Sequence, residues 1–278
     1  FLQNRTSNDI SALRTGLSHH NTILDKSAKI QAAFTVYHHA ENDYWLITDK
    51  AQIPFLIAGL KKYHILERVE FNDHSDCTSF LTVQGASIPA DLLAYCTKQT
   101  IDTISYNLTG EAGYLLITQT RDMLNLVLTE FNQDWIELNP HALEILRIEA
   151  GLPAFESDWT HDTLLPETGI EQTAVSYTKG CYLGQETVAR VKTYGTVQKA
   201  LVGLTFSESV TPTITDCFKN TSDKPLTIIF NGKAIGTIHS SVYSPTLRRV
   251  IALAYLHKDH RQPNQTLSVE INDTSYDV

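Results

Sequence analysis

Eight consecutive residues, Lys179 to Glu186, carry the side chains best suited to chemistry in this sequence. Their order is Lys-Gly-Cys-Tyr-Leu-Gly-Gln-Glu, so two glycines bracket a single cysteine. Glycine adopts backbone conformations that other residues avoid, and the segment is therefore predicted to be a shaped loop. A thiol reacts as its thiolate, which a nearby cation such as Lys179, or a helix N-terminus beginning at Gly184, would stabilise. The pattern predicts a reactive Cys181, and the alternative is a buried, inert cysteine in a turn.

A second candidate is the segment 108–114, in which one glutamate lies between two glycines and is flanked by apolar runs. This pattern predicts a tight turn that presents the carboxylate of Glu111. A carboxylate can accept two parallel N–H bonds from the edge of a planar ring. The alternative is a solvated turn glutamate, because glutamate is usually exposed.

Residues 139–151 carry the signals of a helix. Asn139 is a candidate cap, Pro140 takes the first helical position and Gly151 ends the helix. On this helix Arg147 has a planar fork that suits a carboxylate ligand. Ion pairing between parts of the protein is the alternative for Arg147.

Length and composition are those of an ordinary globular protein. The 278 residues are 42% hydrophobic and 19% charged, enough for one large domain or two to three small ones. The net charge of −9 argues against a broad nucleic-acid footprint, so no direct nucleic-acid partner is expected. No run of about 18 apolar residues appears, and no membrane partner is expected either.

The four cysteines, at 77, 96, 181 and 217, form no C-x-x-C pair. They suit neither a disulfide framework nor a zinc ribbon, which favours a reducing compartment and a cytoplasmic protein. The paired histidines at 19–20 and 38–39 are interpreted as solvated loop residues, because strand neighbours point to opposite faces and cannot readily share one ion. Since the chain opens at Phe1 and not at methionine, some native N-terminal sequence is expected to precede it.

The order of predicted elements indicates an α+β region followed by a β-rich one. A helix is predicted after a cap at 7–9, with Ile10, Leu13 and Leu17 on one face. Further predictions are a hairpin of strands 29–37 and 44–47, helices at 52–64 and 90–96, and strands at 68–71 and 79–83. Five β-rich runs follow, at 198–206, 226–230, 234–242, 250–256 and 267–271, with an Asn-Gly hairpin signal at 231–232. They predict a small barrel or sandwich, and we set the domains at 1–193 and 194–278.

The octapeptide 179–186 resembles the K-G-C-[FY]-x-G-Q-E signature of the YgfZ family, folate-binding relatives of the glycine cleavage T protein. The opening residues 1–10, the segment 108–114 and the helix 139–151 resemble other motifs of the same superfamily: F-L-Q-x-x-x-(T/S)-N-D-(I/V), T-G-E-x-G-(F/Y) and L-R-I-E-x-G. The resemblance covers residues 1 to about 256. It implies the T-protein-like α+β fold, with two α+β lobes around a folate-binding central cleft and a small C-terminal β-barrel.

The resemblance also implies roles for named residues. Tetrahydrofolate, or another folate, would be held by Glu111, Arg147, Tyr114 and Gln185. Cys181 and Lys179 would be the catalytic pair. The aminomethyltransferases use an aspartate after an asparagine-rich strand end, whereas this chain has Leu-Ile-Thr-Asp-Lys at 46–50, so Asp49 cannot be aligned with the catalytic residue.

Three functions remain open from the sequence. The resemblance favours a monomeric factor in iron–sulfur cluster assembly or repair, with an indirect link to tRNA modification and with iron–sulfur client or assembly proteins as partners. One cysteine cannot hold a cluster alone, so a partner would supply the other ligands. The alternatives are a folate-dependent one-carbon transferase and a non-catalytic adaptor with a vestigial folate site.

Overall fold

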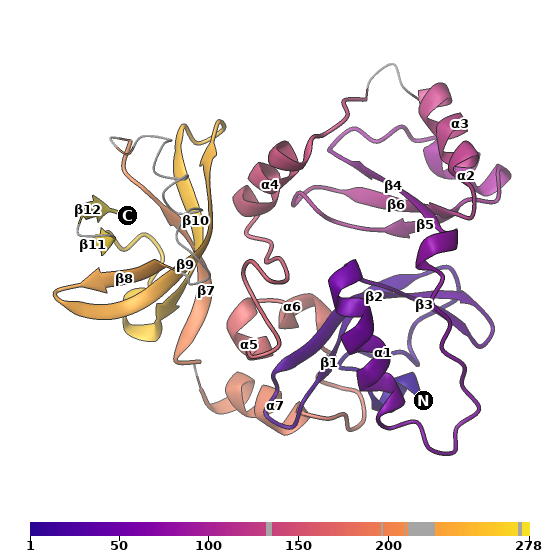
Figure 1. Ribbon diagram of the computed structural model, residues 1–278, viewed down its shortest axis with the longest axis horizontal. Coiled ribbons are helices and arrows are strands. Elements are labelled where there is room, and N and C mark those ends of the chain that lie inside the picture. The colour runs from indigo at the N-terminus through magenta and orange to yellow at the C-terminus, as the bar shows by residue number, and fades with distance from the viewer. Residues whose placement is uncertain (132–134, 196, 209, 211–225, 272–273) are drawn as a thin grey trace.

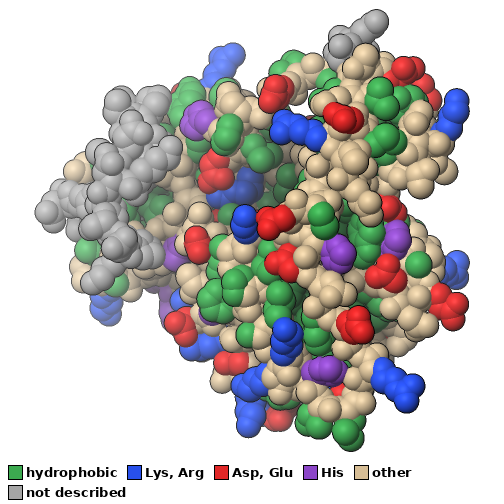
Figure 2. All heavy atoms as spheres, turned by 45° about the vertical axis from the view of Figure 1, so that its right-hand side comes forward, with side chains coloured by type: hydrophobic (Ala, Val, Ile, Leu, Met, Phe, Trp, Pro, Cys, Tyr) green, Lys and Arg blue, Asp and Glu red, His purple; other side chains and the backbone are tan. Residues whose placement is uncertain are grey.

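The computed structural model describes residues 1–131, 135–195, 197–208, 210, 226–271 and 274–278, so Cys217 lies outside the described residues. Two α+β lobes stand one above the other, and a β-domain at the C-terminus lies beside them with helices between (Figure 1). The surface is hollowed between the second lobe and the C-terminal domain, with charged side chains of both signs at the rim (Figure 2). In the described part of the chain no helix is long and apolar enough to cross a membrane. This is the predicted α+β architecture.

The first lobe is a three-stranded antiparallel sheet covered by one helix. Its elements are η1 (Leu2–Asn4), β1 (Ser18–Leu24), β2 (Ile30–Ala40), β3 (Asp43–Ile47), η2 (Lys50–Gln52) and α1 (Ile53–Lys61), and the strands are ordered β1-β2-β3. Leu56 and Leu60 of α1 pack on Ile23, Phe34 and Val36 of the sheet. The predicted hairpin and the predicted helix at 52–64 are confirmed.

The predicted helix from Ile10 to Leu17 is wrong, because this segment forms only turns. Ile10 and Leu13 are buried as expected, whereas Leu17 is exposed. The side chain of Asp9 does accept N–H bonds from the next turn. No helix follows, because the rest of the cap segment is bonded to distant strands and loops, and Gly16 has φ of +82°.

The second lobe repeats the sheet-and-helix plan. It contains η3 (Ser75–Cys77), β4 (Ser79–Gln84), α2 (Leu92–Lys98), β5 (Asp102–Ser105), β6 (Gly113–Thr118) and α3 (Arg121–Phe131), with strand order β4-β6-β5. The strand at 79–83 and the helix at 90–96 are confirmed. The strand predicted at 68–71 is wrong, because this segment pairs with no strand in the described part of the chain. Tyr37 of the first lobe donates to Asp102 of the second at 2.8 Å and so joins the two lobes.

Four helices lead to the C-terminal domain: α4 (Pro140–Glu149), α5 (Leu165–Thr168), α6 (Glu171–Ala174) and α7 (Gln185–Tyr194). The Asn139 side chain accepts from Ala142 N at 2.8 Å, which confirms the predicted cap of α4. Ile145 and Ile148 of α4 pack on Val242, Ile251 and Leu253 of the C-terminal domain. This contact fixes α4 between the second lobe and that domain.

The C-terminal domain is a curled sheet of six strands. They are β7 (Lys199–Thr205), β8 (Leu226–Phe230), β9 (Lys233–Ser244), β10 (Arg249–His257), β11 (Ser268–Ile271) and β12 (Thr274–Asp277), with η5 (Lys258–His260) between β10 and β11. Their order is β12-β11-β8-β9-β10-β7. Ser207 N, just after β7, donates to Asp277 O of β12 at 2.9 Å, so the two edges meet and the sheet closes as a barrel. Asn231 and Gly232 both have positive φ, which confirms the predicted hairpin.

Candidate functional site

The Cys181 loop joins α6 to α7 and presents its thiol to solvent. The helix α7 begins directly after Gly184. Gly184 has φ of +84°, and a Cβ there would lie 2.7 Å from Asp25 O, so only glycine fits. The reactive-cysteine prediction required an accessible sulfur, and the buried alternative is wrong for Cys181.

Lys179 is turned away from solvent and into the protein. Its side chain is 8% exposed, and Nζ donates to three carbonyls, those of Gln3 at 2.5 Å, Thr6 at 2.7 Å and Asn8 at 2.9 Å. Burial lowers the pKa of Lys179 to about 8, and the nearby Asp9 acts in the opposite direction. An ammonium has three N–H bonds, so all three donors are taken by the N-terminal loop. The geometry gives Lys179 a positioning role in the loop that carries Cys181.

The N-terminal loop and the octapeptide, about 170 residues apart in sequence, form one hydrogen-bonded unit. Ser7 is fully buried, and its Oγ donates to Ala174 O at 2.6 Å and lies 2.7 Å from the Thr22 hydroxyl. Ser176 N donates to Ser7 O at 3.1 Å, just before the octapeptide. Two of the four motif segments therefore meet, and they hold the Cys181 loop against β1.

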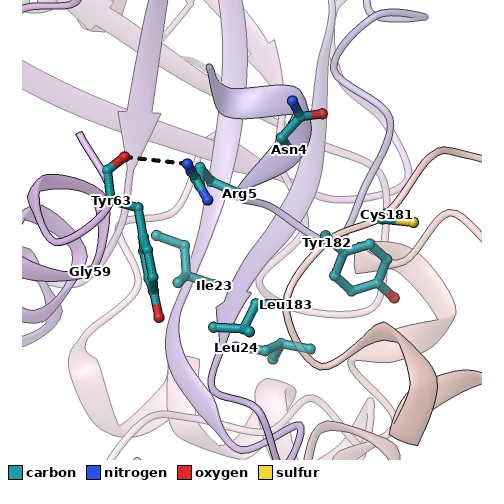
Figure 3. Close-up of a pocket in the computed structure, with 9 residues that line it drawn as sticks. All are labelled: Asn4, Arg5, Ile23, Leu24, Gly59, Tyr63, Cys181, Tyr182 and Leu183. Atoms are coloured by element: carbon teal, nitrogen blue, oxygen red, sulfur yellow. Dashed lines mark hydrogen bonds between the residues drawn. The ribbon is translucent and has the colours of Figure 1, made fainter. Parts of the chain in front are cut away.

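A pocket of about 380 Å³ lies beside the thiol (Figure 3). Its lining residues are Asn4, Arg5, Ile23, Leu24, Gly59, Tyr63, Cys181, Tyr182 and Leu183. The rings of Tyr63 and Tyr182 stand on opposite sides, the aliphatic side chains form the base, and the sulfur of Cys181 is at the outer edge, directed away from Tyr63 (Figure 3). Burial raises the pKa of Tyr182 to about 12, so its phenol is neutral at physiological pH.

The Glu111 turn, residues 107–113 between β5 and β6, is held by two side chains. Asn107 Oδ1 accepts from Gly110 N at 2.7 Å, and Gln84 donates to Tyr106 O at 2.8 Å and accepts from Leu108 N at 3.0 Å. Gly110 has φ of +85°, and a Cβ there would lie 2.6 Å from the Cβ of Ala150 at the end of α4. The turn is therefore rigid and fits closely against α4.

The Glu111 carboxylate points out from this rigid turn and is exposed. It makes no hydrogen bond or ion pair with any residue that the structure describes. Gly85 faces it, and a Cβ at Gly85 would lie 3.7 Å from Glu111 Oε2. The Thr109 hydroxyl is buried and, among the described residues, has no partner. A free carboxylate can accept two parallel N–H bonds from a ligand. Tyr114, on β6, packs against the core of the second lobe.

Arg147 uses all five of its N–H donors within the protein. It donates to both oxygens of Glu144, to Asp158 Oδ2 at 2.6 Å, to Leu152 O at 2.5 Å and to Ser240 Oγ of the C-terminal domain at 3.0 Å. Its contacts match the ion-pairing alternative, and a role toward folate stays a prediction. Ser244 likewise donates to Glu149 at 2.5 Å, so two polar contacts join α4 to β9.

The structure does not bring the thiol and the Glu111 turn together. None of Glu111, Tyr114, Arg147 or Gln185 lines the pocket beside Cys181. Gln185 is the half-buried first residue of α7. The helix α7 lies at the lower edge of the molecule, whereas the β5–β6 turn lies beside α4 in the upper half (Figure 1). The protein thus has two candidate sites, one on each part of the N-terminal region.

Sequence reasoning missed Arg5, Tyr63, Asn107 and Gln84. Asn107 carried a usable signal, because an asparagine two residues before a Thr-Gly pair is typical of a turn in which the side chain bonds the backbone. The other three act through tertiary contacts, which a local pattern does not contain.

Comparison with known proteins identifies the fold. Residues 199–278 match the glycine cleavage T-protein C-terminal barrel domain. The whole chain superimposes on the glycine cleavage system aminomethyltransferase T from Bartonella henselae with a TM-score of 0.72, at 18% identity, over 99% of this chain and 78% of that one. The chain therefore has the fold of this aminomethyltransferase. Its fold has the two lobes and C-terminal barrel that the resemblance implied.

Similarity in sequence to known proteins also extends over most of the chain. An aminomethyltransferase of Bacillus subtilis is 25% identical over 293 residues, which cover 98% of this chain and 78% of the relative. An uncharacterized protein of Haemophilus influenzae is 28% identical over 205 residues, which cover 72% of this chain and 65% of that protein.

Proposed function

We propose that this chain is a tetrahydrofolate-binding factor of the YgfZ type that supports iron–sulfur cluster assembly or repair, and through that process tRNA modification. One observation carries the proposal. The octapeptide thiol is exposed, and Lys179 and Ser7 fix the loop beneath it, so buried bonds are used to display one reactive group. A thiol that served only packing would not need this support.

The folate would be held at the Glu111 turn. Glu111 has its carboxylate free and can accept from the pterin N–H edge, while Tyr114, Arg147 and Gln185 stay predicted contacts. Bound tetrahydrofolate supplies one-carbon chemistry at its ring nitrogens. The rigid turn contributes orientation, since Asn107 and Gln84 fix the backbone on which Glu111 stands.

Cys181 would act on a partner protein. A lone thiolate at a protein surface can accept a leaving group or provide one cluster ligand, and the partner must provide the others. Because the thiol and Glu111 lie on different parts of the protein, folate in this proposal is an effector or a second substrate of the factor.

The first test is genetic complementation with matched cysteine variants. In a cell that lacks the native protein, Cys181→Ser should fail to restore iron–sulfur enzyme activity, whereas Cys77→Ser should restore it, because Cys77 is also exposed but lies in η3. Full rescue by Cys181→Ser would remove the main support for the proposal.

The second test is calorimetric titration of tetrahydrofolate. Micromolar binding to the wild type should weaken at least about tenfold in Glu111→Ala, since a charge-assisted pair of bonds is lost. Glu186→Ala removes an exposed carboxylate that pairs with Arg190; it is the control and should bind as the wild type does. Absence of binding to every protein would favour the adaptor alternative.

Folate-dependent one-carbon transfer is the second candidate function. Its support is the similarity of nearly the whole chain to proteins named aminomethyltransferase. Formation of 5,10-methylene-tetrahydrofolate from an added amine donor, with turnover kept in Cys181→Ser, would favour it over the factor.

A further inference from the structure

The helix α1 carries a glycine, Gly59, where it lines the pocket beside Cys181. In a helix interior glycine is less favourable than every residue except proline. Local packing does not require it, because a Cβ at Gly59 would meet Ile23 Cγ2 at 3.5 Å, an ordinary contact distance. A longer side chain at this position would project into the pocket. The glycine therefore gives up helix stability and keeps the pocket open.

The two aromatic walls of the pocket are held in place by neighbouring cations. The Arg5 guanidinium lies 5.0 Å from the centre of the Tyr63 ring, and Arg5 also donates to Tyr63 O at 3.2 Å. On the other side the buried Tyr182 ring lies 5.4 Å from Lys179 Nζ. With these walls and an aliphatic base, the preformed cavity of about 380 Å³ has the character of a small-molecule site.

Arg5 is the only charged side chain among the described residues that line the pocket. An arginine has five N–H donors, and in the described part of the chain only one of them makes a hydrogen bond, to Tyr63 O. A second guanidinium nitrogen of Arg5 is directed toward Ile23 of the base (Figure 3). Because Nε is buried, a ligand in the pocket would meet the terminal nitrogens.

The carboxylates near this end of the first lobe leave those donors available. Glu67 Oε1 lies 3.9 Å from Arg5, too far for a hydrogen bond, and Glu67 Oε2 accepts from backbone N–H groups of its own loop. The exposed acids that follow, Glu70, Asp73 and Asp76, are not among the residues that line the pocket. The pocket thus combines an apolar interior with unused donors on a single cation.

We infer that this pocket binds a small carboxylate whose body is one aromatic ring or a branched aliphatic chain. The body lies between Tyr63 and Tyr182 on the aliphatic base, and the carboxylate accepts from Arg5. The sulfur of Cys181 is at the outer edge and directed away from Tyr63, so the ligand is a neighbour of the thiol and not its substrate (Figure 3). The inference goes beyond the proposed function, because this site requires neither folate at the Glu111 turn nor a client protein.

The test compares three small ligands by saturation-transfer NMR titration of the full chain. The probe is phenylpropionate, which has one ring and one carboxylate. Phenylpropionamide keeps the ring and the shape but has no charge, and propionate keeps the charge but has no ring. We expect phenylpropionate to bind at least about tenfold more tightly than either comparison ligand, because one lacks the charge-assisted bonds and the other the apolar burial.

Matched variants on α1 test the place of binding. Gly59→Leu should fill the pocket and abolish binding of phenylpropionate, while its unfolding temperature does not fall, because leucine is favoured over glycine in a helix. Ala58→Leu is the control, since Ala58 is the exposed neighbour on the same helix and does not line the pocket. It should bind as the wild type does.

Arg5→Gln tests the assigned contact. This variant should bind phenylpropionate and phenylpropionamide about equally, because the preference for the carboxylate comes from the guanidinium. A mere loss of pocket shape would weaken both ligands alike and leave the preference in place, so the ratio of the two affinities reports on the contact itself.

Three results would overturn the inference: no saturation transfer to phenylpropionate, equal affinity of the wild type for phenylpropionate and its amide, or binding that survives Gly59→Leu. Displacement of phenylpropionate by tetrahydrofolate, unchanged in Glu111→Ala, would also overturn it, because this pocket would then be the folate site. Failure of the proposed function looks different. Cys181→Ser should bind phenylpropionate as the wild type does, whatever its result in complementation.

Discussion

Replacing Lys179 with methionine tests the joint between the N-terminal loop and the Cys181 loop. Methionine keeps the length of the buried side chain but has no N–H to donate. The carbonyls of Gln3, Thr6 and Asn8, now bonded at 2.5–2.9 Å, would lose their donor. An unsatisfied buried polar group costs about 1–3 kcal/mol, so three of them predict a loss of about 3–5 kcal/mol in the free energy of unfolding after partial rehydration.

The stability that the variant loses relative to the wild type should grow with pH. Burial lowers the pKa of Lys179 from 10.5 to about 8 in the folded protein. Between these values the unfolded chain binds more protons than the folded one, so the stability of the wild type rises with pH across this window. At 1.36 kcal/mol per pH unit, the stability difference between the wild type and Lys179→Met increases by about a further 3 kcal/mol between pH 8 and pH 10.5, and this additional part is absent below pH 8.

Urea unfolding at pH 7, 9 and 10.5, followed by tryptophan fluorescence, measures both quantities. Trp45 of the first lobe and the buried Trp159 report on the region that the joint stabilises. Lys192→Met is the matched control, because the Lys192 ammonium lies on α7 and stacks on the exposed ring of Tyr177 at 3.4 Å. It should change stability by less than about 1 kcal/mol at each pH.

Two results would refute this reasoning. A loss below about 1 kcal/mol at pH 7 would mean that the three carbonyls find water and that the joint is not needed. If the stability difference between wild type and Lys179→Met shrinks as pH rises, the hydrogen bonds to the carbonyls raise the pKa of Lys179 more than burial lowers it. The sign of the pH dependence thus separates the two physical effects that meet at Lys179.

Two further predictions concern the contacts around α4. Gly110→Ala should lower the free energy of unfolding by about 1–3 kcal/mol and weaken tetrahydrofolate binding, because a Cβ there would lie 2.6 Å from the Ala150 Cβ at φ of +85°. Unchanged tetrahydrofolate affinity of this variant in calorimetric titration would contradict the prediction. Gly195→Ala is the control, because Gly195 has open space around it. Asp158→Asn should cost about 3–5 kcal/mol in urea unfolding, because the fully buried Asp158 carboxylate neutralises Arg147; a loss below about 1 kcal/mol would show that Glu144 alone suffices.

Local signals in the sequence predicted those elements whose cause is local. The cap at Asn139 and the Asn-Gly turn at 231–232 appear as expected, because each is set by residues in contact along the chain. The helix expected after 7–9 does not form, because Ser7 bonds to Thr22 and Ala174. The strand β1 begins with polar residues and owes its existence to its pairing with β2, so no local pattern announces it.

The candidate site was predicted as a set of residue types and not as an arrangement. The octapeptide and the Glu111 turn were singled out by their motifs, which carry no distance between them. Lys179 shows the limit most clearly. Beside Cys181 in sequence it suggested activation of the thiol, whereas its Nζ is directed to Gln3, Thr6 and Asn8. A spacing of two residues in a loop keeps two side chains close along the backbone but does not determine the direction in which each side chain points.

The arrangement explains why such a motif needs both a buried cation and an exposed thiol. An exposed loop rich in glycine loses much conformational entropy when it is ordered. Here three bonds from Lys179 to the N-terminal loop, and the close fit of Gly184 against Asp25, provide the compensating free energy below the surface. The thiol can then stay exposed without becoming disordered. A group presented in this way is suited to meet a macromolecule, because a small substrate would be better served by an enclosed pocket.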